Sequence, residues 1–337
     1  MKRHFPAIYV ILPPSCEGRR AAFYLATEEY IAEKLPVGSY FFTWKVGPTV
    51  VMGRNQVLHQ EVNLDFCRKE AIDVIRRRSG GGAIFADGNN IMTSLITEDA
   101  AVEPLFQEYA ESVATVLREM GVPTEVSGRN DIVLRDAGKD FKVCGNAFYR
   151  KFNRCIVHGT MLYDTEMRQM EGALHPDVYK LESKGVKSVR SRIGLLKDYL
   201  PFGIDRLQEQ LHQFLCNTTI TLGNDDIQKI EELEQRYYQP EYFYGTSNHA
   251  NIFRRGRIEG VGTLELNICL QDSIISDVSL NGDYFDLGNS EETFKATFIN
   301  KPFTPESIHD AIRTLHPEST IRKLSEDALL QLLMSRD

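Results

Sequence analysis

The sequence has six cysteines in 337 residues, and none of them forms a C-x-x-C pair. This scattered arrangement lacks the ligand spacing of common zinc sites and the paired framework of a disulfide scaffold. Reduced thiols of this kind are typical of a cytoplasmic protein, and we expect the chain to work in the cytoplasm.

Long apolar runs are also missing. No stretch approaches the roughly 20 apolar residues that a membrane-spanning helix needs, so we expect no membrane association. The apolar run at 7–12 ends in Pro13-Pro14, and it therefore predicts a first strand rather than a signal peptide.

Several nucleotide-binding and hydrolase motifs are absent. The sequence has no Walker pattern, no G-x-G-x-x-G, no G-x-S-x-G and no H-E-x-x-H, which gives little support to P-loop, Rossmann, serine hydrolase or zinc peptidase chemistry. The net charge of −8 argues against a nucleic-acid partner, because such proteins normally present a basic face.

The residue pattern predicts an α+β protein. Helical spacing of apolar residues predicts helices at 19–35, 65–70, 104–120, 165–181, 203–216 and 225–238. Apolar and β-branched runs predict strands at 7–12, 40–44, 49–53, 71–78, 91–96, 122–126, 131–134, 141–149 and 155–163.

The character of the sequence changes near Tyr237, where an aromatic, turn-rich stretch begins. We predict a first domain over 1–240, a linker at 241–247 and a small α+β domain over 248–337. Within the small domain the pattern predicts strands at 251–258, 261–270 and 273–280, followed by helices that begin at Pro305 and near Ser325.

The stretch 76–85 is the strongest local feature of the sequence. Three arginines are followed by Ser79 and then by three consecutive glycines, and a strand is predicted on each side. Glycines allow positive φ and close approach of a ligand, and successive N–H groups in such a turn bind anions. A tight hairpin with solvated arginines is the alternative, but the combination of three arginines and three glycines favours anion binding.

Further residues could complete an anion pocket. Lys142 and His158 each lie on a predicted strand with an internal glycine, although a solvent-facing lysine and a core histidine are the commoner cases. A basic loop at 184–192 adds more positive charge. Cys144 and Cys155 are candidate nucleophiles, but the sequence offers neither a convincing partner base.

Five motifs support a family resemblance. In chain order they are Arg-Arg-x-Ser-Gly-Gly-Gly-Ala, Ser-Gly-Arg-Asn-Asp, Lys-x-x-Gly-x-Ala, His-Gly-Thr and Ser-Val-Arg-Ser-Arg. Together they resemble the lipoate–protein ligases over nearly the whole chain. The resemblance implies a large mixed-sheet catalytic domain of the biotin/lipoate ligase type and a small accessory domain that takes part in adenylation.

The resemblance also implies a two-step reaction. Lipoate and ATP, escorted by Mg²⁺, would form lipoyl-AMP, and the lipoyl group would then pass to a lysine of a lipoyl domain. By similarity, Lys142 is the catalytic residue that contacts the carboxyl oxygen and the α-phosphate. The residues that match substrate-binding or adenylate-binding positions are Trp44, Arg77, Ser79, Gly80, Gly81, Gly82, Ala83, Asn90, Asn130, Asp131, Gly145, His158 and Arg190.

The implied partners are the lipoyl domains of 2-oxoacid dehydrogenase acyltransferase subunits and the glycine-cleavage H protein. We expect a monomer, and the sequence assigns no metal ligands. Three residues depart from the family pattern: Ala86 replaces a histidine, Asn89 a glycine and Tyr24 an asparagine.

Two other functions remain open at the level of sequence. One is an ATP-independent lipoyl or octanoyl transferase, although the turn at 127–131 lacks the cysteine that related octanoyltransferases use. The other is a non-catalytic relative that only binds lipoate. This alternative stays open because Ala86 stands where the family commonly has a histidine.

Overall fold

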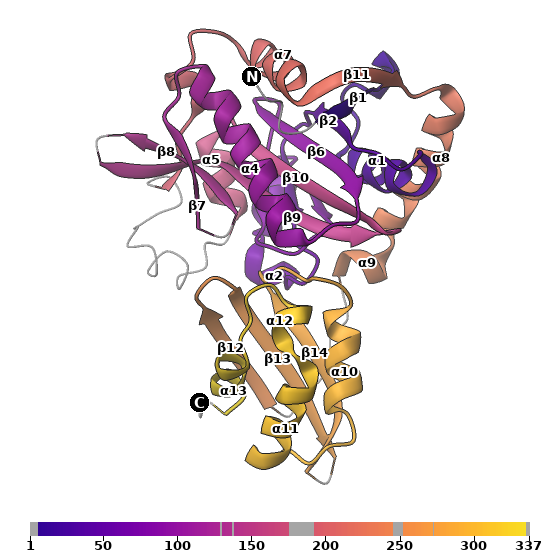
Figure 1. The fold of residues 1–337 in the computed structure, drawn as a ribbon, viewed down its shortest axis with the longest axis vertical. Helices are drawn as coiled ribbons and strands as arrows, with labels where there is room; N and C mark the ends of the chain where they lie inside the picture. The colour runs from indigo at the N-terminus through magenta and orange to yellow at the C-terminus, as the bar shows by residue number, and fades with distance from the viewer. Residues whose placement is uncertain are drawn as a thin grey trace.

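The computed structural model describes residues 6–128, 130–136, 138–174, 192–244, 252–271 and 273–334 (Figure 1). Its strands form an eight-stranded sheet and two three-stranded sheets. No helix within these ranges is long and apolar enough to cross a membrane.

The large sheet is mixed. Its first two strand pairs, β11–β1 and β1–β2, are parallel, and the pairs from β2 to β7 are antiparallel. In spatial order its strands are β11 (Cys216–Thr221), β1 (Ala7–Ile11), β2 (Tyr40–Trp44), β6 (Asn90–Glu98), β10 (Arg154–Leu162), β9 (Lys139–Lys151), β8 (Asp131–Asp136) and β7 (Thr124–Ser127).

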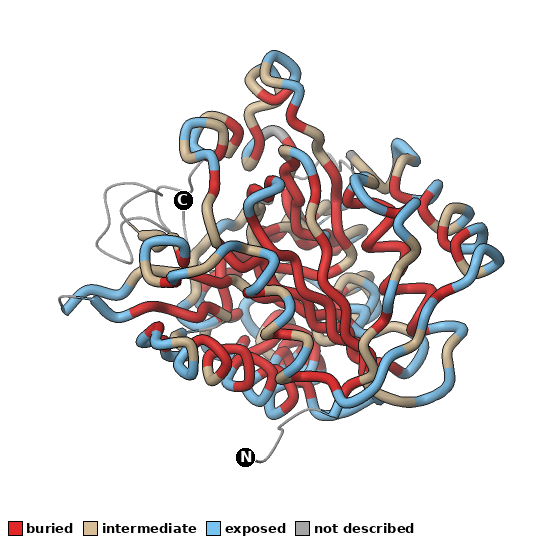
Figure 2. The backbone as a smooth tube through the Cα atoms, turned by 90° about the horizontal axis from the view of Figure 1, so that it is seen from above, coloured by how far each residue is buried: buried red, intermediate tan, exposed pale blue. Residues whose placement is uncertain are grey.

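Both faces of this sheet are buried under helices, because successive side chains of a strand point to opposite faces. Phe41 belongs to the core beneath α4 (Val102–Glu119) and α7 (Ile204–Leu215). Its neighbour Phe42 belongs to the core beneath α1 (Ala21–Lys34) and α8 (Asn224–Glu234). The buried strands therefore run through the middle of the molecule (Figure 2).

The triple-glycine stretch belongs to a smaller sheet. Its spatial order is β4 (Asp73–Arg76), β3 (Thr49–Met52) and β5 (Ile84–Ala86). Because β3 lies between β4 and β5, the loop 77–83 crosses one end of β3, and the hairpin alternative is wrong. Short helices cover this sheet: α2 (Leu58–Glu61), α3 (Leu64–Lys69) and α5 (Met167–Ala173).

The C-terminal module, defined here as β12 through α13, has its own core. Its antiparallel sheet is β12 (Ile252–Ile258), β13 (Gly262–Gln271) and β14 (Ile274–Gly282), and its helices are α10 (Ser290–Phe298), α11 (Pro305–Leu315), α12 (Pro317–Thr320) and α13 (Glu326–Met334). One side chain of the module, Phe285, is buried instead in the core beneath α4, near Phe106 and Phe148.

The α+β fold with a large mixed sheet and a small C-terminal sheet is confirmed. The sequence missed β11, whose residues are mostly exposed, and also α10. The predicted helix at 165–181 is wrong in extent: α5 ends at Ala173, and 175–181 lie outside the described ranges.

The division into domains at 241–247 stays a prediction. Within that segment, α9 (Pro240–Tyr244) is helical, and Tyr242 packs edge-on against Tyr237. Three short 3-10 helices complete the described elements, namely η1 (Pro14–Cys16), η3 (Leu196–Asp198) and η4 (Gln235–Tyr238).

Candidate active site

A cavity of about 920 Å³ lies between the large sheet, the triple-glycine loop and the C-terminal module. An apolar wall is formed by Leu25, Trp44, Val51, Ile84 and Met92. A charged wall is formed by Lys142, Asp131, Arg192, Arg257, Glu259 and Lys323. A ligand with an apolar tail and an anionic head would match this division.

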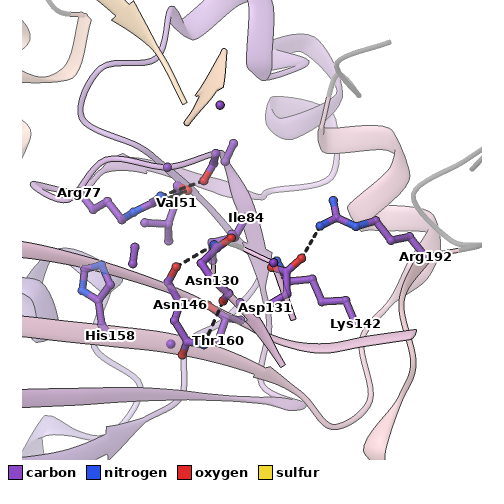
Figure 3. Close-up of a pocket in the computed structure, with 18 of the residues that line it drawn as sticks. Val51, Arg77, Ile84, Asn130, Asp131, Lys142, Asn146, His158, Thr160 and Arg192 are labelled. Atoms are coloured by element: carbon purple, nitrogen blue, oxygen red, sulfur yellow. Dashed lines mark hydrogen bonds and ion pairs between the residues drawn. The ribbon is translucent and has the colours of Figure 1, made fainter. Parts of the chain in front are cut away.

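Arg77 holds the triple-glycine loop in shape (Figure 3). Its guanidinium donates to the carbonyl oxygens of Val51 at 3.0 Å, Gly80 at 2.6 Å and Gly82 at 2.9 Å. Burial lowers the pKa of Arg77 to about 10, so the side chain is still charged at neutral pH. Arg77 therefore fixes the loop through its carbonyls and places a positive charge beside the cavity.

Close backbone contacts require glycine at position 80 in this loop and at position 53, which lies against the loop. A Cβ on Gly80 would lie 2.1 Å from the carbonyl oxygen of Tyr284, and one on Gly53 would lie 1.9 Å from that of Gly81. The N–H of Gly81 donates to the Tyr284 carbonyl at 3.0 Å. The loop thus forms part of the contact between the C-terminal module and the rest of the chain.

Lys142 is held at the charged wall by Asp131 (Figure 3). One carboxylate oxygen of Asp131 forms an ion pair with the Lys142 Nζ at 2.8 Å, and the other forms one with the Arg192 Nη2 at 2.5 Å. The Lys142 side chain folds over Gly145, where a Cβ would lie 2.3 Å from its Nζ. Gly145 therefore makes room for the lysine to lie along the strand and reach the cavity.

Trp44 forms the fixed part of the apolar wall. Its ring stacks on Tyr24 with centroids 4.9 Å apart, and its Nε1 donates to the Ser94 hydroxyl at 3.0 Å. Tyr24 and Ala86, two of the departures from the family pattern, are both buried in the same core as Trp44. An aromatic and a small apolar side chain thus stand at two positions where the sequence resemblance predicts polar ones.

The predicted site residues fall into three groups. Trp44, Arg77, Gly81, Gly82, Ala83, Asn130, Asp131, Lys142, Gly145 and His158 line the cavity. Ser79 and Gly80 lie in the same loop but are not among the lining residues. Asn90 instead donates to Asp87 and Thr165, each at 3.2 Å, and Arg190 lies outside the described ranges.

The resemblance implied a role for the C-terminal module in adenylation, but sequence reasoning named none of its residues that line the cavity. Arg257 and Glu259, at the end of β12, and Lys323, just before α13, line the cavity. No local motif marks these residues, since their position depends on how the module contacts the rest of the chain. Asn146 was also missed as a lining residue. Its side-chain amide donates to the backbone carbonyl of Asn130, and the side-chain amide of Asn130 donates to the backbone carbonyl of Asn146.

Cys144 does not have the environment of a nucleophile. Its side chain is buried, and burial raises the pKa of its thiol to about 12. A thiol needs a lowered pKa to react at neutral pH. Cys155 is buried as well, facing the core beneath α4.

Among the described residues, no group of three or more His, Cys, Asp or Glu side chains could hold a metal ion. Asp131 and Glu259 are the carboxylates that line the described part of the cavity. Mg²⁺ usually binds proteins through one or two carboxylates together with substrate phosphates. The donor set therefore fits a magnesium ion that arrives with a phosphorylated ligand.

The comparisons with known proteins identify both parts of the chain. Residues 20–216 match the model of the lipoyl protein ligase A/B catalytic domain, and residues 247–333 match that of the bacterial lipoate protein ligase C-terminus. The chain is 29% identical over 322 residues to the Bacillus subtilis lipoate-protein ligase LplJ, covering 92% of this chain and 95% of the relative.

Solved structures of the same fold are similar to the whole chain or most of it. The P. falciparum LipL1 structure in complex with lipoate has a TM-score of 0.74 at 18% identity, covering 97% of this chain and 99% of that one. A lipoate-protein ligase A bound with ATP has a TM-score of 0.58 at 23% identity, covering 71% and 98%. The chain therefore belongs to the lipoate–protein ligase family, with its catalytic and C-terminal domains in one polypeptide.

Proposed function

We propose that this protein is an ATP-dependent lipoate–protein ligase. The observation that carries the proposal is the cavity, which joins an apolar wall at Trp44 to a charged wall at Lys142 beside an arginine-supported glycine loop. Lipoate has an apolar tail and a carboxylate head, and ATP supplies further negative charge. Family membership supports the same reading.

In the first step, a lipoate carboxylate oxygen attacks the α-phosphorus of ATP. The bond between the α-phosphorus and its bridging oxygen to the β-phosphate breaks, and pyrophosphate leaves with the electron pair. Lys142 stabilises the negative charge that builds on the carboxyl and phosphoryl oxygens, and Arg77 adds charge from below the loop. The enzyme's part is to position the reactants, so no covalent protein intermediate is needed.

Mg²⁺ would neutralise part of the phosphate charge when bound. Asp131 and Glu259 are the described residues that could hold it, directly or through water. Asp131 also orients Lys142 and Arg192.

In the second step, the ε-amine of an acceptor lysine attacks the carbonyl carbon of lipoyl-AMP. The bond from that carbon to the phosphate oxygen breaks, AMP leaves and an amide forms. We propose that the acceptors are the lipoyl domains of 2-oxoacid dehydrogenase acyltransferase subunits and the glycine-cleavage H protein. We also propose a cytoplasmic monomer with domains at 1–240 and 248–337.

The two alternatives receive less support from the site. A covalent transferase would need a reactive cysteine, and burial keeps Cys144 protonated. A non-catalytic binder would not need Lys142 to be held at the cavity by Asp131.

The test uses the full chain with ATP, Mg²⁺, lipoate and a purified lipoyl domain. With ATP, Mg²⁺ and lipoate but no lipoyl domain, we expect pyrophosphate to be released. When the lipoyl domain is added, we expect its mass to increase by one lipoyl group. Release of no pyrophosphate with lipoate or any medium-chain acid would contradict the proposal. Tight lipoate binding by calorimetry without turnover would favour the non-catalytic reading.

A further inference from the structure

A chain of buried hydrogen bonds runs beneath the triple-glycine loop. The Arg77 Nε donates to the Ser79 hydroxyl at 2.7 Å, and that hydroxyl lies 2.7 Å from the Nε2 of His158. The Nδ1 of His158 lies 3.0 Å and 3.1 Å from the two carboxylate oxygens of Glu28. Glu28 and Ser79 are both 0% exposed.

The direction of each hydrogen bond follows from the donors. Arginine only donates, so the Ser79 oxygen accepts from Arg77, and its own hydrogen needs an acceptor. The Nε2 of His158, 2.7 Å away, accepts this hydrogen when it carries none of its own. The remaining imidazole hydrogen is then on Nδ1 and is donated to Glu28. This tautomer of His158 gives the Ser79 hydroxyl and the Glu28 carboxylate complementary partners.

Glu28 also contacts the apolar wall of the cavity. It accepts a hydrogen bond from the Ser94 hydroxyl at 2.6 Å, and Ser94 in turn accepts from the Trp44 indole. The Tyr149 hydroxyl donates to the second carboxylate oxygen of Glu28 at 3.2 Å. One buried carboxylate on α1 thus joins four strands of the large sheet to the loop.

The order serine, histidine, carboxylate is also that of a serine nucleophile with its general base. Two observations argue against attack by Ser79. Its side chain is fully buried and does not line the cavity. Its oxygen already accepts a hydrogen bond from a charged donor, which withdraws electron density from the lone pairs.

We propose that Glu28 is a positioning residue for adenylate formation, acting through His158 and Ser79 on the triple-glycine loop. The carboxylate fixes the His158 tautomer, the histidine orients the Ser79 hydroxyl, and Ser79 with Arg77 sets the path of the glycine backbone. This inference rests on the proposed function and names a residue that acts at that same site without touching the substrate.

The experiment compares Glu28→Gln with Glu29→Gln in the full chain. Glu29 is the adjacent residue, is 1% exposed and binds Arg78, Lys151 and Tyr237 rather than the histidine. We expect Glu28→Gln to lower kcat for pyrophosphate release about tenfold, with KM for lipoate changed less than about threefold, because the loop is misplaced. We expect the Glu29→Gln variant to lose thermal stability with a much smaller loss of kcat.

A spectroscopic measurement tests the chain without relying on turnover. In protein labelled with ¹⁵N-histidine, assigned with a His158→Asn variant, we expect His158 to be protonated at Nδ1 and bare at Nε2. The Glu28→Gln variant should lose this single tautomer. If wild-type protein releases no pyrophosphate, the proposed function fails, whereas this measurement still decides the hydrogen-bond chain.

Several results would overturn the proposal. They are equal kcat losses in the two glutamine variants, an Nε2-protonated His158 in the wild type, or an acyl adduct on Ser79 after incubation with lipoyl-AMP. If Glu28→Gln does not fold, Ser79→Ala replaces it, with an expected kcat loss of about 100-fold. An unchanged kcat in Ser79→Ala would also contradict the inference.

Discussion

The apolar wall of the cavity is built within one module, whereas the charged wall takes side chains from two. Trp44 is held by Tyr24, which belongs to the same core, and by Ser94 on β6 of the large sheet. The charged wall combines Lys142 with Arg257 and Lys323 of the C-terminal module. The apolar wall should therefore keep its shape if the C-terminal module moves. The charged wall is complete only when the C-terminal module contacts the rest of the chain.

The largest expected effect is at the charged wall. Lys142→Ala should lower pyrophosphate release by about 10³-fold, because the charge that forms on the reacting oxygens loses its stabilising cation. Stopped-flow or coupled pyrophosphate assays measure the loss. The control is Lys139→Ala, an exposed lysine on the same strand, and a loss of similar size there would show that the strand itself was disturbed.

At the apolar wall, Trp44→Ala should raise KM for lipoate roughly thirtyfold, since removal of the indole takes away about 2 kcal/mol of apolar contact. KM for ATP should hardly change, because Trp44 is anchored in a different part of the site. Steady-state kinetics with each substrate varied in turn separates the two. Equal changes in both constants would contradict the division into two walls.

The contact between the modules can be weakened at Gly80. A Cβ there would lie 2.1 Å from the Tyr284 carbonyl oxygen, so Gly80→Ala should separate the modules and slow pyrophosphate release roughly tenfold. Transfer from preformed lipoyl-AMP to a lipoyl domain should be affected less. Gly47→Ala is the matched control, because nothing lies within 4 Å of its Cβ.

Lys323→Ala should have a smaller effect, raising KM for ATP roughly fivefold as one cation is removed from a partly exposed position. The change should shrink as salt concentration rises, because ions screen exposed charges. Lys301→Ala, in the same module but absent from the cavity lining, serves as the control. A salt-independent effect would indicate a structural role for Lys323.

The smallest effect is expected at Cys144. Because its thiol is already protonated, Cys144→Ser should change both half-reactions less than about twofold. Its folded-state pKa of about 12 lies above the ordinary value of 9.0, so the folded state holds a proton that the unfolded state loses. The free energy of unfolding should therefore fall as pH rises from about 9 to 12, and the serine variant should lack this contribution. Chemical denaturation across that range measures it.

Much of the fold could be predicted because the spacing of apolar residues along the chain indicates most of the helices and strands. The alternation of Phe41 and Phe42 between two cores follows directly from strand geometry. Strand β11 was missed because Cys216 is its only buried residue, which leaves no apolar pattern. Residue placement that depends on contacts between distant segments, such as Lys323 beside the cavity, has no local signal.

The site shows the same limit. The glycine loop and Lys142 stand out in the sequence, and both lie at the cavity. The role of Arg77 in binding the loop's own carbonyls could not be foreseen, because it depends on the path of the loop over β3. Likewise, Glu28 and His158 meet only because α1 lies over β10, 130 positions later in the chain.

Gly53 gives the triple-glycine motif a discontinuous fourth member. The carbonyl of Gly81 lies where a Cβ of residue 53 would be, so any larger side chain there would push the loop away from β3. A pattern search over contiguous residues would not detect this requirement, and a mutational scan restricted to 76–85 would not reveal it. In directed evolution of this pocket, position 53 should therefore be kept fixed along with the loop, although it lies 27 positions before the first of the three glycines.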